Sequence, residues 1–272
     1  MFTLDEWDIL CEKISDQENV ITINEILNQP LESRWVAIKH DIETNVDKAL
    51  KVARIEAHHN IKATYYFQAD LVDDNFHIME QIADLGHEVT YHYDVLDSNK
   101  GDYELAIKSF NDNLKKFERY GFKVQTVCPH GNPIMIRNGW TSNKDFFRHE
   151  KVQSLFPKIL DMVVQLPTKL KKNYLYISDA GFGWKQIVNI DSNDIISEGD
   201  IKLNGNKEVI NKIQSRQSLI ISTHPHRWES NILIYYLNYF TFKVLRLFTM
   251  IISKVPPIKM ILSKYYFLAK RI

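Results

Sequence analysis

Cysteine is scarce in this chain of 272 residues, which has only Cys11 and Cys128. Two cysteines are too few for a disulfide framework or a four-cysteine zinc site, and so low a count is typical of a reducing compartment. The sequence also lacks a secretory signal, because its first residues, MFTLDEWDILCEK, are acidic and contain no basic segment followed by an apolar one. We therefore expect free thiols and a cytoplasmic protein.

A net charge is missing too, since 34 Lys and Arg side chains balance 34 Asp and Glu side chains. This balance disfavours a generally basic nucleic-acid binder. The charges are unevenly placed, however: residues 1–100 carry 8 basic and 20 acidic side chains, and residues 201–272 carry 12 basic and 2 acidic ones. With 44% hydrophobic residues, the composition is that of a folded protein and excludes disordered and collagen-like classes.

Short segments rich in β-branched and aromatic residues alternate with segments of helical spacing. This alternation predicts a mainly parallel sheet or barrel. The predicted strands are 35–41, 61–68, 87–92, 123–128, 174–178 and 219–223, with weaker signals at 159–164 and 187–190, and the predicted helices are 45–59, 76–85 and 102–120.

Ionisable side chains stand at the ends of five predicted strands. In parallel α/β folds such ends meet at one edge of the sheet, where functional groups gather. A single histidine there is more often structural than a ligand, but carboxylates and imidazoles from several strands are the donors that zinc takes. Such a site predicts metal-assisted hydrolysis of an amide or ester. The residues are His40, Asp41 and Glu43, then His92 and Asp94, then His130, Asp179 and His224.

Six segments in order resemble the motifs of the polysaccharide deacetylase family, the NodB-like carbohydrate esterases. They are IKHDIE, a variant of the HDxD type, then ATYYFQ, LGHEVTYHYD, VCPHGNP, YISDAGFGW and STHPHRW. The resemblance covers residues 35–228 and implies a distorted (β/α) barrel of about seven parallel strands. It also implies a divalent metal, zinc first among the candidates, at the mouth of the barrel, and hydrolysis of acetyl groups on sugars. Residues 1–228 would form the barrel, and residues 229–272 an extension of amphipathic helices.

The resemblance assigns roles to individual residues. Asp41 corresponds to the general base, and His224 to the group that protonates the leaving amine or alcohol. Glu43 and His92 correspond to metal ligands, and His130 would replace a ligand that the chain lacks. Asp41 also has a simpler interpretation, as the cap of the helix that begins near residue 45.

Four more residues are expected beside the substrate or behind the ligands: His40, Asp94, Asp179 and Trp184. In the family an acid at the position of Asp179 orients the active site. An aromatic residue at the position of Trp184 forms a pocket wall, although core packing explains this tryptophan equally well. His226 is expected at the surface.

Two departures from the family pattern bear on function. Leu96 stands where the motif has its second metal histidine, and the arginine of the third motif is absent near Val127. These losses leave a catalytically degenerate sugar-binding protein as the alternative to an enzyme. Retention of Asp41 and His224 favours the enzyme, a deacetylase of a sugar or sugar conjugate in surface polysaccharide synthesis. A nucleophilic pair of Cys128 and His130 is disfavoured, because no third group orients it.

The C-terminal residues 231–272 contain seven basic residues, no acidic residue and many aromatic and aliphatic ones. The longest uncharged run, about 13 residues from Ser230, is too short to span a membrane. Two interpretations stay open: peripheral binding to an anionic membrane surface, or packing against the acidic first hundred residues. Nucleic acid is not an expected partner, because no RNA-binding module is recognisable.

Overall fold

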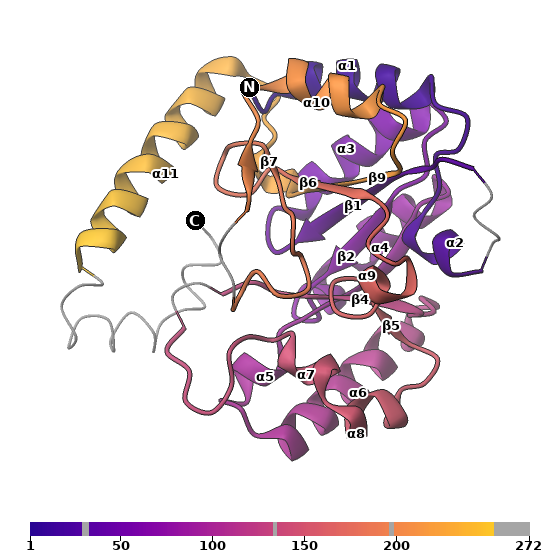
Figure 1. Cartoon of the computed structure of the whole chain (residues 1–272), viewed down its shortest axis with the longest axis vertical. Helices are drawn as coiled ribbons and strands as arrows, with labels where there is room; N and C mark the ends of the chain where they lie inside the picture. The colour runs from indigo at the N-terminus through magenta and orange to yellow at the C-terminus, as the bar shows by residue number, and fades with distance from the viewer. Residues whose placement is uncertain (29–32, 133–134, 196–198, 253–272) are drawn as a thin grey trace.

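A single sheet forms the centre of the protein (Figure 1). The structure is a computed structural model and describes residues 1–28, 33–132, 135–195 and 199–252. The strands are β1 (Val36–Ile42), β2 (Thr64–Phe67), β3 (Glu88–Tyr93), β4 (Thr126–Pro129), β5 (Leu160–Asp161), β6 (Leu175–Ser178), β7 (Lys185–Gln186), β8 (Ile201–Lys202) and β9 (Leu219–Thr223).

Within the described residues the strand order is β5-β4-β3-β2-β1-β9-β6-β7-β8. The seven strands from β5 to β6 in this order pair in parallel, and β7 pairs antiparallel with both β6 and β8. The predicted fold class, an α/β fold with about seven parallel strands, is therefore confirmed. The predicted strand at 187–190 is wrong, because the chain pairs at Lys185–Gln186 instead and then turns.

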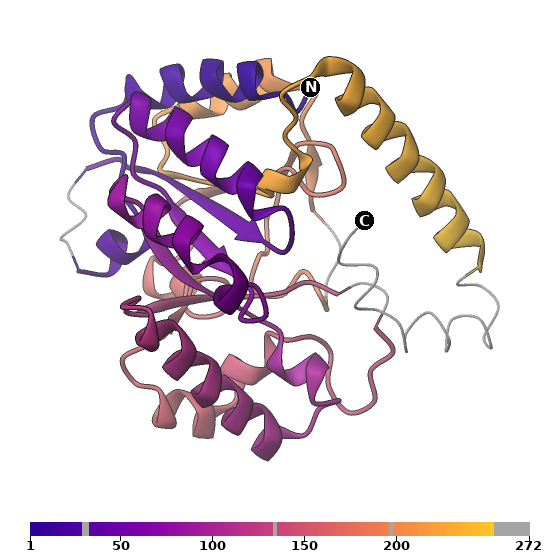
Figure 2. The same ribbon diagram turned by 180° about the vertical axis from the view of Figure 1, so that it is seen from behind.

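Helices cover the outside of the sheet. Figure 2 shows α1, α3, α4 and α6 lying side by side in one row, and their mutual contacts agree with this picture. The helices are α1 (Leu4–Ser15), α2 (Ile23–Asn28), α3 (Val46–His58), α4 (Val72–Asp84), α5 (Val95–Ser98), α6 (Tyr103–Arg119), α7 (Asp145–Arg148), α8 (Glu150–Leu155), α9 (Leu166–Lys169), α10 (Asn206–Ile213), the 3-10 turn η1 (Pro225–Arg227) and α11 (Ile232–Ile252).

Strand β1 is buried on both faces, so its alternating side chains enter two different layers. Ile38 belongs to the large hydrophobic cluster that also contains residues of the outer helices. Ala37 belongs to a smaller cluster on the other face, together with Cys128 and Ile220. This alternation decides which polar residues of β1 can reach the inner face.

The C-terminal extension begins as the long helix α11, which extends along one side of the molecule (Figure 1). A helix after residue 229 was expected, and the rest of that expectation, residues 253–272, lies outside the described residues. None of the helices in the described part of the chain combines the length and apolar content needed to cross a bilayer. The domain boundary at residue 228 stays a prediction.

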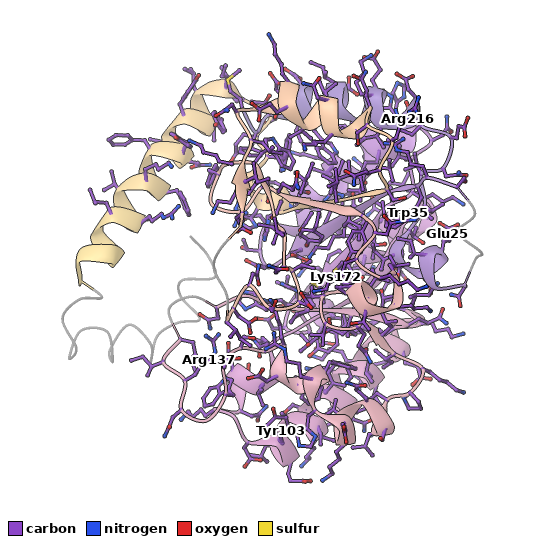
Figure 3. All side chains as sticks on the ribbon, viewed as in Figure 1. Glu25, Trp35, Tyr103, Arg137, Lys172 and Arg216 are labelled. Atoms are coloured by element: carbon purple, nitrogen blue, oxygen red, sulfur yellow. The ribbon has the colours of Figure 1, made fainter. Side chains whose placement is uncertain are left out.

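A buried carboxylate ties the loop after β4 to α5. Asp97 accepts hydrogen bonds from Arg137 Nε and Nη2, both at 2.7 Å, and from Trp140 Nε1 at 2.8 Å. Asn143 Nδ2 donates both to Asp97, at 3.0 Å, and to the carbonyl oxygen of His130, at 2.9 Å. Figure 3 labels Arg137 on this loop. The network therefore fixes the backbone at His130, one of the expected metal ligands.

Gly101 lies against the ring of Trp140, and substitution of this glycine tests that contact. Its φ of +83° is unfavourable for other residues, and an added Cβ would overlap the ring of Trp140. We expect Gly101→Ala to reduce the free energy of unfolding by about 2–4 kcal/mol, from backbone strain plus overpacking. Gly121→Ala is the matched control, since its φ is +82° but nothing lies within 4 Å of the added Cβ. Chemical denaturation measures both, and equal losses would contradict the contact with Trp140.

Candidate active site

Three expected metal ligands lie together at the carboxyl ends of neighbouring strands. Glu43 follows β1, His92 lies in β3 and His130 follows β4. Glu43 Oε1 is 3.5 Å from His92 Nε2 and 3.3 Å from His130 Nε2. One donor atom from each of the three residues lies within 4.8 Å of the others. Residues 49 and 87 positions away from Glu43 in sequence therefore present their donor atoms to it.

These separations fit a tetrahedral metal site. Two ligand atoms at zinc distances and a tetrahedral angle lie about 3.4 Å apart, close to both values measured from Glu43. His92 Nδ1 lies 3.0 Å from the carbonyl oxygen of Cys128. Because a carbonyl can only accept, Nδ1 carries a hydrogen, and in the neutral imidazole this leaves the lone pair on Nε2. His92 Nε2 is buried and has no hydrogen-bond partner in the described residues, as a metal-binding nitrogen requires.

The charge of Glu43 is maintained by its histidine neighbours. Burial alone would raise the pKa of this carboxyl group, but His130 and His92 outweigh burial and hold the pKa well below its usual value. Two imidazoles and one carboxylate form a donor set suited to a catalytic zinc ion, which takes three protein ligands.

Asp41 lies next to this cluster on the same face of β1. Its Oδ1 is 4.0 Å from His92 Nδ1, and its Oδ2 is 3.9 Å from His224 Nε2. Asp41 lies within β1 and before α3 begins at Val46, and the N-cap of α3 is Asn45, so Asp41 is not the cap of this helix.

Lys39 is a candidate site residue that the sequence did not point to. Its buried Nζ donates to both oxygens of Asp41, at 2.7 and 2.6 Å, and lies 3.1 Å from Cys128 Sγ. Burial would raise the pKa of Asp41, but the charges of Lys39, His92 and His224 lower it to about 2. The signal was its spacing, because residues two apart in a strand point to the same face.

His224 is oriented by Asp179. The buried carboxylate of Asp179, just after β6, accepts from His224 Nδ1 at 2.6 Å and from the His224 backbone N–H at 3.0 Å. Arg227 Nη1 and Trp228 Nε1 also donate to Asp179, at 3.1 and 3.3 Å. Burial would raise the pKa of Asp179, but His224 and Arg227 lower it. With Nδ1 held in this way, Nε2 of His224 points toward Asp41.

The sequence suggested a surface position for His226, and this expectation is wrong. The side chain is half-buried beside His224, with ring centroids 5.8 Å apart. His226 lies in the 3-10 turn η1, which begins at Pro225 directly after His224. Burial, together with the charge of Arg227, lowers the pKa of His226 to about 3, and the carboxylate of Glu43 opposes this shift. His226 therefore stays neutral near the metal ligands.

Two expected site residues lie elsewhere. His40 is on the opposite face of β1, where its Nδ1 and Nε2 are 2.6 and 2.7 Å from Thr223 Oγ1 and Glu56 Oε1. Its place follows from strand alternation, since Lys39 and Asp41 occupy the inner face. Trp184 is 2% exposed and packs against Phe2, which confirms the core interpretation over the pocket wall.

Asp94, Leu96 and the two cysteines also have defined places in the structure. Asp94 is half-buried directly after β3 as the N-cap of α5, and it interacts electrostatically with Tyr91. Leu96, at the position of the missing histidine, is fully buried in the hydrophobic core. Cys11 and Cys128 are both buried free thiols, as expected. Burial, with the nearby Asp41 charge, raises the pKa of Cys128 well above its usual value, which disfavours an activated nucleophile.

Comparisons with known proteins give matches only among solved structures. No family model and no curated protein matches the chain. A family 4 carbohydrate esterase from Streptomyces lividans, in complex with acetate, is 12% identical with a TM-score of 0.44, over 79% of this chain and 90% of the other. The peptidoglycan deacetylase PdaC from Bacillus subtilis is 12% identical with a TM-score of 0.39, over 84% of this chain and 100% of the other.

A pseudoenzyme of the same esterase family, from Bacillus anthracis, is 14% identical with a TM-score of 0.43, over 79% of this chain. The present chain spans 63% of that protein's length. These are the kind of proteins that the sequence motifs resemble. With identities below 25% and TM-scores below 0.5, the likeness adds nothing about catalysis, which has to be argued from the site itself.

Removal of one ligand tests the metal site directly. We expect the purified protein to bind about one equivalent of zinc, and His92→Ala or His130→Ala to weaken binding at least tenfold, because each removes one of three protein ligands. Elemental analysis and competition with a chromophoric chelator measure this. His77→Ala, which removes an exposed imidazole, should bind zinc like the wild type. Equal zinc content in all variants would contradict the ligand assignment.

Proposed function

We propose that this protein is a metal-dependent hydrolase that removes an N-linked or O-linked acetyl group from a sugar or sugar conjugate. The proposal rests on two sets of side chains that lie together at one edge of the sheet. One is the ligand set of Glu43, His92 and His130, and the other is Asp41 opposite His224. Metal-assisted hydrolysis of an acetyl group uses metal ligands, a carboxylate as general base and an imidazole as general acid.

Glu43, His92 and His130 would hold a divalent ion, with zinc as our first candidate, and this ion would supply Lewis acidity for the hydrolysis. Asp41 is kept ionised by Lys39 and accepts the proton of the attacking water. His224, held by Asp179 through Nδ1, donates a proton from Nε2 to the departing nitrogen or oxygen. The 3.9 Å between Asp41 Oδ2 and His224 Nε2 supports a base and an acid that act on one substrate.

The runner-up is a sugar-binding protein without turnover. The observation that favours it is the bidentate contact of Lys39 with Asp41. A carboxylate with a pKa of about 2 is a weak base. The enzyme remains our proposal because His224 and Asp179 form an acid and orienting pair that binding alone does not need.

The cellular setting is part of the same proposal. Buried free thiols at Cys11 and Cys128 suit a reducing compartment, and we propose the cytoplasm. The acetylated substrate is proposed to serve surface polysaccharide synthesis.

Acetate release from acetylated sugars tests the function. The zinc-loaded protein is assayed with N-acetylglucosamine oligomers and with O-acetylated xylan. We expect turnover of one substrate class and a loss of about 100-fold or more in His224→Asn, because positioned acids and bases typically contribute 10²–10⁴-fold. Binding of these sugars without acetate release would favour the runner-up.

The role of Asp41 as the base is tested with a double variant. Asp41→Asn alone leaves the buried ammonium of Lys39 without its charge partner. We expect this single change to cost about 3–5 kcal/mol of folding free energy and the double variant Lys39→Met with Asp41→Asn to recover most of it. Both should lack turnover. Asp73→Asn, which breaks an exposed pair with Lys116, is the control with normal activity. Turnover in the stably folded double variant would show that Asp41 is not the base.

A further inference from the structure

Helix α11 has two distinct faces. On the inner face, Tyr235, Tyr239 and Phe242 all contact the ring of Phe182, with ring centroids 6.5, 6.1 and 5.0 Å apart. Tyr235 is only 6% exposed. The side chain of Arg246, on the same face, comes close to Gly181. These contacts fasten the helix to the loop that follows β6.

The opposite face is apolar and exposed. A single line of side chains, which we call the outer stripe, recurs at intervals of four, three, four and three residues along the helix and extends about 21 Å. Each of its members is 47–74% exposed. The outer stripe consists of Leu233, Leu237, Phe240, Val244 and Leu247. Contiguous apolar surface of this kind marks an interaction site rather than ordinary exposure.

The charge of this part of the chain identifies the partner. Residues 231–272 contain seven basic residues and no acidic residue, and Lys243 and Arg246 lie on α11 itself. A second copy that covered the stripe with its own α11 would add more basic residues and no acidic residue from this helix. An anionic lipid surface instead offers negative headgroups to the basic residues and acyl chains to the stripe.

We propose that the outer stripe binds a membrane surface containing anionic lipid, with α11 lying in the plane of the interface. The inner face packs against Phe182, which leaves the outer stripe open to lipid. Phe182 is three residues after Asp179, and α11 extends along the side of the molecule at which the β1 arrow ends (Figures 1 and 2). Binding thus holds the mouth of the site beside the lipid headgroups. Acetylated sugars carried on that membrane are then the accessible substrates, a consequence that rests on the proposed function.

Vesicle flotation of the full-length protein tests this inference. The probes are phosphatidylcholine vesicles with and without phosphatidylglycerol. We expect binding to the anionic vesicles and little to the neutral ones, weakened by salt. The variant Leu237→Gln with Phe240→Gln should reduce binding at least tenfold, because it removes apolar side chains from the stripe. Lys243→Gln, which removes an exposed basic side chain of α11, should reduce it several-fold.

The matched control is Leu105→Gln with Leu155→Gln, which removes two apolar side chains of similar exposure, 52% and 51%, outside α11. It should bind like the wild type. Absence of wild-type binding to the anionic vesicles, or equal binding by the stripe variant, overturns the proposal. A wild-type dimer that the stripe variant converts to a monomer, without any vesicle binding, would identify a second copy as the occupant.

Flotation is independent of catalysis. The Lys39→Met, Asp41→Asn variant should float like the wild type, because its changes are inside the barrel. Failure of the deacetylase assay with normal flotation would reject the proposed function and leave the membrane surface standing.

Discussion

Side-chain alternation along β1 is the constraint on which the site depends. The strand is buried on both faces, so each polar residue must find partners on its own side. Lys39 and Asp41 pair on the inner face. His40 pairs with Glu56 and Thr223 on the outer face. A shift of register by one residue would exchange the two sets and place His40 at the mouth.

Charge pairing then explains how so many ionisable groups can be buried together. Each buried charge that the site needs has a counter-charge or a set of donors close by. Lys39 balances Asp41, and Arg227 with His224 balances Asp179. Glu43 depends on the imidazoles of His92 and His130, which are also its proposed partners in holding a metal. This arrangement keeps the proposed base ionised, and it also makes that base weak.

The rest of the chain positions the site and connects it to its surroundings. Asp97 secures the loop at His130 through Arg137 and Asn143. On the other side, α11 rests on Phe182, a short distance in sequence from Asp179. The proposed membrane surface and the proposed active site therefore share one loop. A substrate brought by the membrane would approach the groups that we assign to catalysis.

The sequence by itself determined the parallel α/β class, because strand and helix periodicities are local. It also singled out Asp41, Glu43, His92, His130 and His224 as candidate site residues, because polar residues at strand ends stand out. Only the tertiary structure decided which residues meet. It paired Lys39 with Asp41, turned His226 inward and put His40 and Trp184 in the core. The outer stripe is also set by tertiary structure, because Phe182 covers the other face of α11. Periodicity shows which residues share a face, but only packing shows what that face meets.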